Sequence, residues 1–455
     1  MSLDSILVDP VDSLNLEQIE VLPSYTSITQ PPLLTAPQIA TAYIIPPSTG
    51  SGVKVGIISL GGGFSQSDLN RSMTNLGLTT GNVTFVGVNG ATNDYNPVHG
   101  NSASYKGTVE NTLDLVCVAG MVPNANIVLY KADDDDYYLT TDPNVAANLN
   151  STRHFANVLN RAVDDNCDVI SISWGGSEKK IVSGITYYCG DFLAGPLANA
   201  VAKGISVFVS AGDYGSQAVN SSDPAFQIVS ADYPSTNANL VAVGGTYLSL
   251  TGSNTRSGNE TVYNISGGGG GGGISSFVSA PSWQANLTYK TYPDNVVHNV
   301  TTRSIPDISA PMNGYGLWLN GNVMSVGGTS ASAPIMAGMV ARFISLNGGR
   351  RPIQPLNKLF YNNLNSFYDI PTGNNASLLP IGYAATPGWD ATTGWGSQTN
   401  ATQTYQSITS GGLKVKNSSG AWAPVKNVSV KNNSGTWAAV NKVWTKTASG
   451  WTQVF

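Results

Sequence analysis

The sequence predicts an α/β protein built on a doubly wound parallel sheet with helices on both faces. Short apolar, β-branched runs recur along the chain, at 53–59, 125–131, 167–173, 204–210 and 239–245. Nearly continuous apolar runs of this length are typical of parallel strands that are covered on both faces. Longer helical patterns alternate with them, at about 107–120, 152–165, 190–203 and 331–346. Strand–helix alternation of this kind favours right-handed crossovers within one sheet.

Composition divides the chain into three zones. Residues 1–35 are punctuated by Pro and Ser and contain no long periodic segment, so we expect an extended N-terminal arm. Residues 36–408 hold the alternating strands and helices and are expected to form the main domain. Residues 411–455 differ from both because they repeat.

The C-terminal zone has a period of 15 residues, set by glycines at 420, 435 and 450. Each glycine follows a Ser, and a Trp follows at 422, 437 and 451. A Ser-Gly turn between alternating segments predicts a β-hairpin, and the Trp supplies an apolar anchor for the returning strand. A stabilising tail and a docking module are equally compatible with three such hairpins. The repeats resemble those that end structural proteins of tailed bacteriophages, which implies a phage or other particle as a partner of residues 411–455.

Charge and composition exclude several functional classes. The 455 residues include 22 Lys and Arg against 27 Asp and Glu, a net charge of −5 with no basic run. This argues against nucleic-acid binding, which depends on phosphate neutralisation. No apolar stretch approaches the roughly 18 residues that a membrane span needs, so no span is predicted. Three cysteines allow one disulfide at most, and whether Cys167 and Cys189 pair is left open.

The most informative segment is the Gly-rich turn Gly327–Pro334, GGTSASAP, which is followed by an apolar helical run. A serine in such a turn, here Ser330, is expected to be exposed at the start of a helix, where the helix dipole favours a developing anion. This predicts a nucleophile. The alternative at this point is an ordinary Gly/Ser cap of a buried helix.

A serine nucleophile needs a base, and the three histidines, His99, His154 and His298, stand in unsuitable contexts. The predicted helix 107–120 instead carries Glu110 and Asp114, which are four residues apart and project from one face. Two close carboxylates raise one pKa, so that one group can act as an acid or a base. Such a pair is often a solvated helix face, but the apolar residues around it indicate burial, and buried carboxylates need a reason.

A third carboxylate, Asp213, directly follows the apolar run 204–210. Loops at the carboxyl ends of parallel strands are where open α/β sheets build their sites. A protonated Asp213 could donate a hydrogen bond to an oxyanion. An Asx-turn aspartate is the alternative.

These residues together resemble the sedolisin (serine-carboxyl peptidase) family, which is subtilisin-like in fold and uses Glu and Asp in place of His and Asp. Its E-x-x-x-D helix matches Glu110 and Asp114, its S-G-D loop matches 211–213, and its G-T-S-A-S-x-P turn matches 328–334. Further segments match in order: DVISISWGGSE (168–178), DYPSTNANLVAVGGT (232–246), GGGGISSF (270–277), SIPDISA (304–310) and FYDIPTGNNA (367–376). The likeness runs from about Leu34 to Ser397.

The resemblance implies a serine-type endopeptidase that cleaves peptide bonds at acidic pH. Ser330 would be the nucleophile and Glu110 its general base. Asp114 would orient Glu110, and Asp213 would serve the oxyanion hole. An edge around Ser171, Ser173, Trp174 and Gly175 would pair with a protein or peptide substrate as an added strand. The glycines 267–273 would permit close backbone approach on the other side, or form a floppy loop.

The resemblance also implies one structural Ca²⁺ ion. The implied ligands are two aspartates and three backbone carbonyls, which here are Asp369, Ile370, Thr386, Gly388 and Asp390. Hard oxygen ligands suit Ca²⁺. The family usually has glycine where Thr386 stands.

Members of the family are usually made with a large N-terminal prosegment, and only about 34 residues precede the matched region here. With residues 1–10 lacking a secretory signal pattern, we expect an extracellular or virion-associated peptidase. A secreted enzyme without its prosegment is the rival. A sedolisin-like structural or virion component with little peptidase activity, docked by its C-terminal repeats, is the alternative function.

Overall fold

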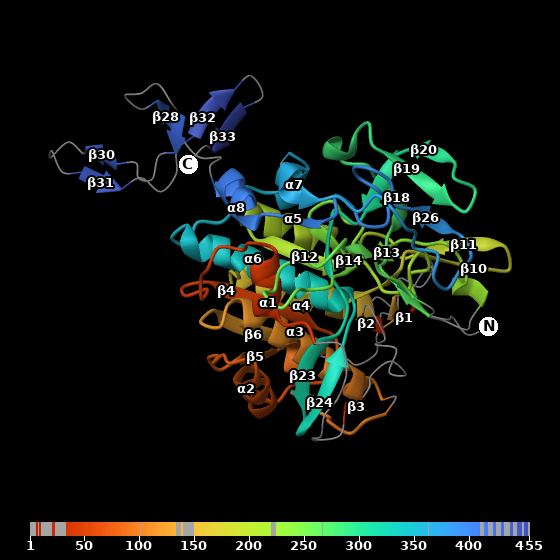
Figure 1. The fold of residues 1–455 in the computed structure, drawn as a ribbon, viewed down its shortest axis with the longest axis horizontal. Coiled ribbons are helices and arrows are strands. Elements are labelled where there is room, and N and C mark those ends of the chain that lie inside the picture. The colour runs from red at the N-terminus through yellow and green to blue at the C-terminus, as the bar shows by residue number, and fades with distance from the viewer. Residues whose placement is uncertain are drawn as a thin grey trace.

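The computed structural model describes residues 33–100, 102–132, 153–219, 224–265, 267–362 and 364–408 in full. Outside these ranges it describes only the backbone of short segments, which are named with their elements below. The chain folds around one central sheet with helices on both sides (Figure 1).

Seven parallel strands form the central sheet, in the order β22-β14-β12-β8-β4-β6-β5, and the short β15 (Thr261–Val262) pairs antiparallel with β14. This confirms the predicted fold class and the five predicted strands. The bounds are β4 Lys54–Ser59, β5 Thr84–Gly87, β6 Asn126–Lys131, β8 Val169–Ile172, β12 Ser206–Ser210, β14 Val241–Tyr247 and β22 Ile308–Pro311.

Alternate residues of these strands enter two separate apolar cores. In β4, Val55 and Ile57 belong to one core and Ile58 belongs to the other. The first core contains residues of α1, α2, α3, α6 and α8, and the second contains residues of α4 and α5. Burial on both faces explains why the strands are apolar throughout.

The four predicted helices exist, with ends within four residues of the predicted ones. They are α3 Ala103–Met121, α4 Asn150–Asp164, α5 Ala194–Ala202 and α6 Thr329–Leu346. Four further helices were not predicted: α1 Ala36–Ala42, α2 Gln66–Asn75, α7 Leu356–Tyr361 and α8 Ala401–Thr409. No helix of the described residues is long and apolar enough to cross a bilayer.

Small antiparallel sheets surround the central one. Three of them include a strand of the N-terminal arm: β1 pairs with β7, β2 pairs with β9, and β3 pairs with β24. The bounds are β1 Ile6–Leu7, β2 Asp9–Pro10, β3 Val21–Leu22, β7 Tyr138–Leu139, β9 Trp174–Ser177, β10 Lys179–Val182, β11 Ile185–Tyr188, β13 Asp232–Tyr233, β16 Asn264–Ile265, β17 Gly268–Gly269, β18 Gly273–Ser279, β19 Thr288–Tyr292, β20 Val297–Asn299, β21 Thr302–Ile305, β23 Tyr315–Leu319, β24 Asn322–Val326, β25 Phe367–Tyr368, β26 Gly382–Ala384 and β27 Ser397–Gln398.

Residues 411–455 contribute three two-stranded antiparallel pairs. They are β28 Lys414–Lys416 with β29 Trp422–Pro424, β30 Ser429–Lys431 with β31 Trp437–Ala439, and β32 Trp444–Thr447 with β33 Gly450–Gln453. The side chains of these strands lie outside the described residues, so the stacking of the tryptophans stays a prediction.

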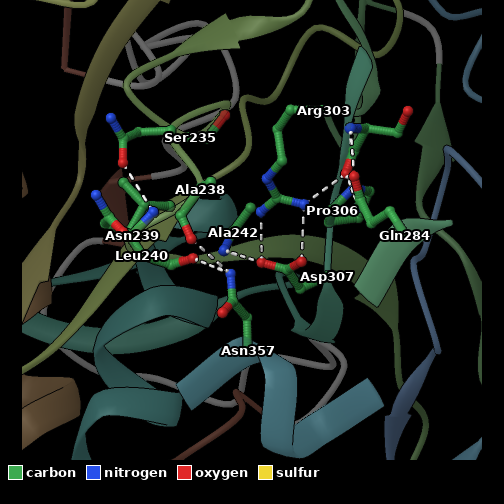
Figure 2. A network of polar contacts seen from close by, with 12 residues as sticks. Ser235, Ala238, Asn239, Leu240, Ala242, Gln284, Arg303, Pro306, Asp307 and Asn357 are labelled. Atoms are coloured by element: carbon green, nitrogen blue, oxygen red, sulfur yellow. Dashed lines mark hydrogen bonds and ion pairs between the residues drawn. The ribbon is translucent and has the colours of Figure 1, made fainter. Parts of the chain in front are cut away.

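A buried ion pair ties β21 and β22 to β14 (Figure 2). Arg303 donates to both oxygens of Asp307, at 2.8 and 2.6 Å, and the backbone N–H of Ala242 donates to Asp307 at 2.9 Å. Arg303 and Asp307 are both fully buried. Loss of one partner would leave an uncompensated buried charge, which is costly. The ring of Pro306, next to Asp307, would lie 3.2 Å from a Cβ at Gly272, so the Gly-rich segment described below packs closely against this residue.

Candidate active site

Helix α6 begins with the predicted nucleophile in its first turn. Gly328 caps the helix with a φ of 134°, which favours glycine, and Ser330 is the second helical residue. The N–H groups of a helix's first turn are not used by the helix itself, so they suit an anion. Pro334 lacks the N–H that would bond to the carbonyl of Ser330. That carbonyl instead accepts a hydrogen bond from the hydroxyl of Ser173, at 3.3 Å.

Ser330 itself is fully buried, which corrects the expectation of an exposed serine. The expectation treated the turn in isolation. In the fold, Ser173 contacts one side of the turn and Asp213 bonds to Thr329 on the other.

Helix α3 places Glu110 and Asp114 against α6. Its first half packs on the turn that follows β4, where Gly62 has a φ of +61° and a Cβ would lie 2.3 Å from the backbone N of Thr108. Asn111 donates to the carbonyls of Gly61 and Gly63, at 2.9 and 3.2 Å. These contacts fix the rotation of α3, so Glu110 and Asp114, both fully buried, lie beside Ser330 and Ser173.

Burial raises the proton affinity of both carboxyl groups, and Asp114 raises that of Glu110 further. Burial, and then the neighbouring Asp114, raise the pKa of Glu110 well above its usual range, and burial does the same to the pKa of Asp114. The hydroxyls of Ser330 and Ser173 act in the opposite direction on Glu110 and lower its pKa. Neither oxygen of Glu110 has a hydrogen bond of ordinary geometry with the described residues. Catalytic hydrogen bonds are often long until a substrate binds.

Asp213 occupies the loop after β12, and its position depends on close backbone approach. Asp213 follows Gly212, whose φ of +102° suits glycine. The N–H of Gly271 donates to the carbonyl of Gly212, and the N–H of Gly269 donates to the carbonyl of Asp213 at 2.7 Å. A Cβ at Gly271 would lie 2.0 Å from the carbonyl oxygen of Ala211. The Gly-rich segment is therefore packed against this loop, and the floppy-loop interpretation is wrong.

The carboxyl group of Asp213 faces the start of α6. Its Oδ1 accepts hydrogen bonds from the backbone N–H and from the hydroxyl of Thr329, each at 2.6 Å. Burial raises the pKa of Asp213 to about 7, although these two hydrogen bonds act to lower it. Asp213 can therefore hold a proton through the acidic range and act as a hydrogen-bond donor there.

One member of the predicted substrate edge, Ser171, does not lie at an edge. Ser171 pairs with Ile57 of β4 and with Phe208 of β12, so it lies inside the central sheet and cannot bind a peptide backbone. The prediction took the whole segment as one strand, whereas β8 ends at Ile172 and β9 begins at Trp174.

The remaining members of the predicted edge lie in different settings. The side chain of Ser173 faces Asp114, at 2.7 Å, and the carbonyl of Ser330. Trp174 and Gly175 belong to β9, which pairs antiparallel with the arm strand β2. Asp9 lies opposite Gly175, and Pro10 lies opposite Trp174.

None of the three histidines stands in the site. His99 contacts the ring of Tyr105 at 5.3 Å between centroids, and His298 stacks on Tyr289 at 5.1 Å. His154 lies on α4, whose apolar residues belong to the opposite core from those of α3 and α6.

Two carboxylates near the site were missed in the sequence. Asp232 is buried, neither of its oxygens has a hydrogen-bond partner among the described residues, and burial followed by Glu178 and Asp213 raises its pKa. Glu178 accepts from Ser275 at 2.6 Å and from the N–H of Ser276 at 2.8 Å. Both lie in segments that resemble the family, 168–178 and 232–246, and this resemblance was the available signal. Nothing in the local pattern indicates that the fold brings them together.

The predicted calcium residues come from two segments that meet at the turn 386–390. The N–H of Gly388 donates to Asp369 at 3.0 Å, and the N–H of Thr386 donates to Asp390 at 3.1 Å, so both carboxyl groups reach the turn 386–390. The donor set is all oxygen, which fits Ca²⁺. The described residues contain no group of three or more His, Cys, Asp or Glu placed to hold a metal. The predicted set has two carboxylates and three carbonyls, among them that of Ile370, so it stays a prediction.

The three cysteines are buried free thiols. The open question of a pair between Cys167 and Cys189 is thereby answered in the negative for this structure.

Residues 50–396 match the model of the family described as "Subtilase family". The chain belongs to the subtilase family. Among curated relatives it is 34% identical to kumamolisin of Bacillus sp. (strain MN-32) over 382 residues, 81% of this chain and 62% of the relative. It is 32% identical to sedolisin of Pseudomonas sp. (strain 101) over 372 residues, 77% of this chain and 57% of the relative.

A solved structure supports the same subtilase architecture. It is Pseudomonas sedolisin, a serine-carboxyl proteinase, in complex with two molecules of pseudo-iodotyrostatin. The TM-score is 0.64 at 27% identity, covering 82% of this chain and 97% of that one. The chain therefore has a subtilisin-like fold of the sedolisin type. It spans about three fifths of the length of the curated relatives that it matches.

Proposed function

We propose that this subtilase is a serine-carboxyl endopeptidase that hydrolyses peptide bonds at acidic pH. The observation that carries the proposal is the juxtaposition of Ser330 with two buried carboxyl groups on α3, in a site that contains no histidine among the described residues. The names of the relatives, kumamolisin and sedolisin, support the same class.

The first step is attack by Ser330. Its Oγ forms a bond to the carbonyl carbon of the substrate while the hydroxyl proton passes to Glu110, and the carbonyl π electrons move to oxygen. Glu110 then gives that proton to the leaving amine as the C–N bond breaks. Water hydrolyses the resulting ester by the same route in reverse. Asp114 keeps Glu110 a strong base, because its proximity raises the pKa of Glu110.

The negative oxygen of the tetrahedral intermediate is stabilised by two groups. One is the backbone N–H of Ser330 in the first turn of α6. The other is the protonated carboxyl group of Asp213, whose raised pKa keeps it neutral under acid. A hydrogen-bond donor in this position is worth about 10²–10³ in kcat.

The substrate backbone binds to β9 as an added strand. Support comes from the arm strand β2, which already pairs antiparallel with Trp174 and Gly175 of β9. An extended chain therefore fits this edge, and main-chain hydrogen bonds supply affinity with little sequence preference.

A calcium ion is proposed to stabilise the turn 386–390. Asp369 and Asp390 would provide carboxylate oxygens, and Ile370, Thr386 and Gly388 would provide carbonyls. The positive charge of the ion would offset the burial that raises the pKa of Asp390 to about 7. Its role is structural, and the chemistry above does not pass through it.

The remaining proposals concern the setting of the enzyme. An extracellular or virion-associated location, with residues 411–455 binding a phage or other particle, rests on the repeats and their three strand pairs. The alternative is a structural component of a particle with little peptidase activity.

Labelling of the nucleophile distinguishes the two functions. A peptide aldehyde should form a covalent adduct at Ser330 at pH 3–5, detected by mass spectrometry, and Ser330→Ala should abolish both the adduct and peptide cleavage. Glu110→Gln should retain the fold and lower kcat by at least ~10²-fold. Undiminished cleavage by Ser330→Ala would exclude this mechanism, and a wild-type chain that neither reacts nor cleaves would favour the structural alternative.

A further inference from the structure

Thr329, the residue before the nucleophile, forms two hydrogen bonds with the same oxygen of Asp213. Its backbone N–H and its hydroxyl both lie 2.6 Å from Oδ1 of Asp213. A backbone N–H can only donate, so Oδ1 accepts at least that hydrogen bond. Thr329 is fully buried, which holds these contacts in one geometry.

The direction of the hydroxyl contact follows from a third residue. The N–H of Gly212 donates to Oγ1 of Thr329, at 3.2 Å. Because this N–H approaches the oxygen of Thr329, the hydroxyl hydrogen is directed away from Gly212 and toward Asp213. Both donors of Thr329 therefore converge on Oδ1.

Two donors on one oxygen decide where a neutral carboxyl group carries its proton. The carbonyl oxygen of a carboxylic acid is the better acceptor, whereas a proton on Oδ1 would meet two other hydrogens at 2.6 Å contacts. The proton therefore belongs on Oδ2. We propose that Thr329 is a positioning residue that fixes the proton of Asp213 on Oδ2 and so aims that O–H at the oxyanion. The inference rests on the proposed function and adds a residue to it.

The other titratable groups that face Asp213 do not supply this orientation. Asp232 and Tyr263 both interact with Asp213 electrostatically, and Glu178 interacts with Asp232. Burial raises the pKa of Asp232 and of Tyr263, so both are neutral under acid. Neither oxygen of Asp232 has a hydrogen-bond partner among the described residues, so Asp232 does not select one oxygen of Asp213, whereas the donors of Thr329 do.

The test compares Thr329→Val, which removes the hydroxyl and keeps the size, with Thr329→Ser, which restores it. The readouts are the pH dependence of kcat/KM on a peptide and the melting temperature. The Thr329 hydroxyl stabilises the charged form of Asp213 and lowers its pKa. Its loss should therefore move the alkaline limb of the activity profile to higher pH, and kcat should fall about tenfold, less than the 10²–10³ lost with a whole oxyanion donor. Thr329→Ser should restore the wild-type limb.

A second set of variants is made in the Asp213→Asn background, which removes the titratable carboxyl group of Asp213. In Asp213→Asn the amide cannot lose a proton in this range, so adding Thr329→Val should lower kcat without moving any limb. An alkaline limb that Thr329→Val leaves in place, or that Thr329→Ser fails to restore, would overturn the inference.

The outcome does not depend on activity alone. In the Ser330→Ala background, the part of the pH dependence of the melting temperature that Asp213→Asn removes reports the proton of Asp213. Thr329→Val should move that part to higher pH, whereas the contribution of Asp390, which also titrates at about 7, should stay unchanged. A chain that shows this shift but cleaves no peptide would refute the proposed function and keep the role of Thr329. A chain that cleaves peptide through Ser330 but lacks this shift would support the proposed function and refute the role of Thr329.

Discussion

The hydroxyl of Ser173 lies 2.7 Å from Oδ1 of Asp114, and it also approaches the carbonyl of Ser330 at 3.3 Å. A serine hydroxyl has one hydrogen, so the two acceptors share it, and the shorter contact is the one to Asp114. Donation to the carboxylate lowers the pKa of Asp114, against the burial that raises it. The resulting chain, from Asp114 through Ser173 to the carbonyl that Pro334 leaves without a helical donor, couples α3 to α6.

Ser173→Ala should therefore shift the acid limb of the activity profile. The Ser173 hydroxyl lowers the pKa of both Glu110 and Asp114. Without it the base holds its proton to higher pH, so the acid limb should move upward and kcat should fall while KM changes little. The measurement is kcat and KM between pH 2 and 6. Ser171→Ala is the matched control, because Ser171 lies two residues earlier, inside the sheet. Equal acid limbs in the two variants would contradict the coupling.

Activity and stability should both decline as pH rises toward 7. Asp213 titrates at about 7 in the folded chain, against 3.8 for an ordinary aspartate. Between these values the folded state binds more protons than the unfolded state, so the free energy of unfolding is largest at low pH and falls through this window.

Asp213→Asn should flatten part of that decline and extend activity to higher pH, because an amide donates at any pH. Melting curves and kcat/KM across pH 3–8 test both effects. A wild-type activity maximum at pH 7–8 would be incompatible with a protonated Asp213.

Calcium removal should lower the melting temperature. A ligand that binds only the folded state adds about 2.7 kcal/mol of stability when its concentration is 100 times Kd. Chelation should remove that increment, and Asp369→Asn or Asp390→Asn should abolish the response to calcium. Asp294→Asn is the control, because Asp294 is an exposed aspartate in the β19–β20 hairpin region, with its carboxyl group bonded to Thr291. Identical melting curves with and without chelator would exclude the site.

Deletion of residues 1–15 should increase the affinity for peptides. It removes β2, which occupies the backbone of β9 at Trp174 and Gly175. KM for a peptide long enough to pair with β9 should fall several-fold at unchanged kcat, since no catalytic group is touched. Deletion of residues 440–455 serves as a control of similar size. If KM is unaffected by the N-terminal deletion, β9 is not the edge that binds substrate.

Much of this fold could be predicted because its strands and helices differ strongly in pattern. The five predicted strands are buried on both faces, so their apolar runs are unbroken. The helices between them have a different pattern, in which polar and apolar residues follow the helical period. The small sheets that join short strands from distant parts of the sequence could not be predicted. Strands such as β13 and β27 are two residues long, and their partners lie far away in the sequence.

The sequence by itself determined the types of group in the candidate site. A carboxylate pair with helical spacing, an aspartate after a buried strand and a serine in a Gly-rich turn are each local patterns. The tertiary structure decided how they meet. The hydroxyl of Ser173 donates to Asp114, Ser171 lies inside the sheet, and Thr329 contacts Asp213. The physical reason is that hydrogen bonds and pKa shifts depend on distances of a few ångströms and on burial. Packing of α3, α6 and the 211–215 loop sets both, across more than 200 residues of chain between Glu110 and Ser330.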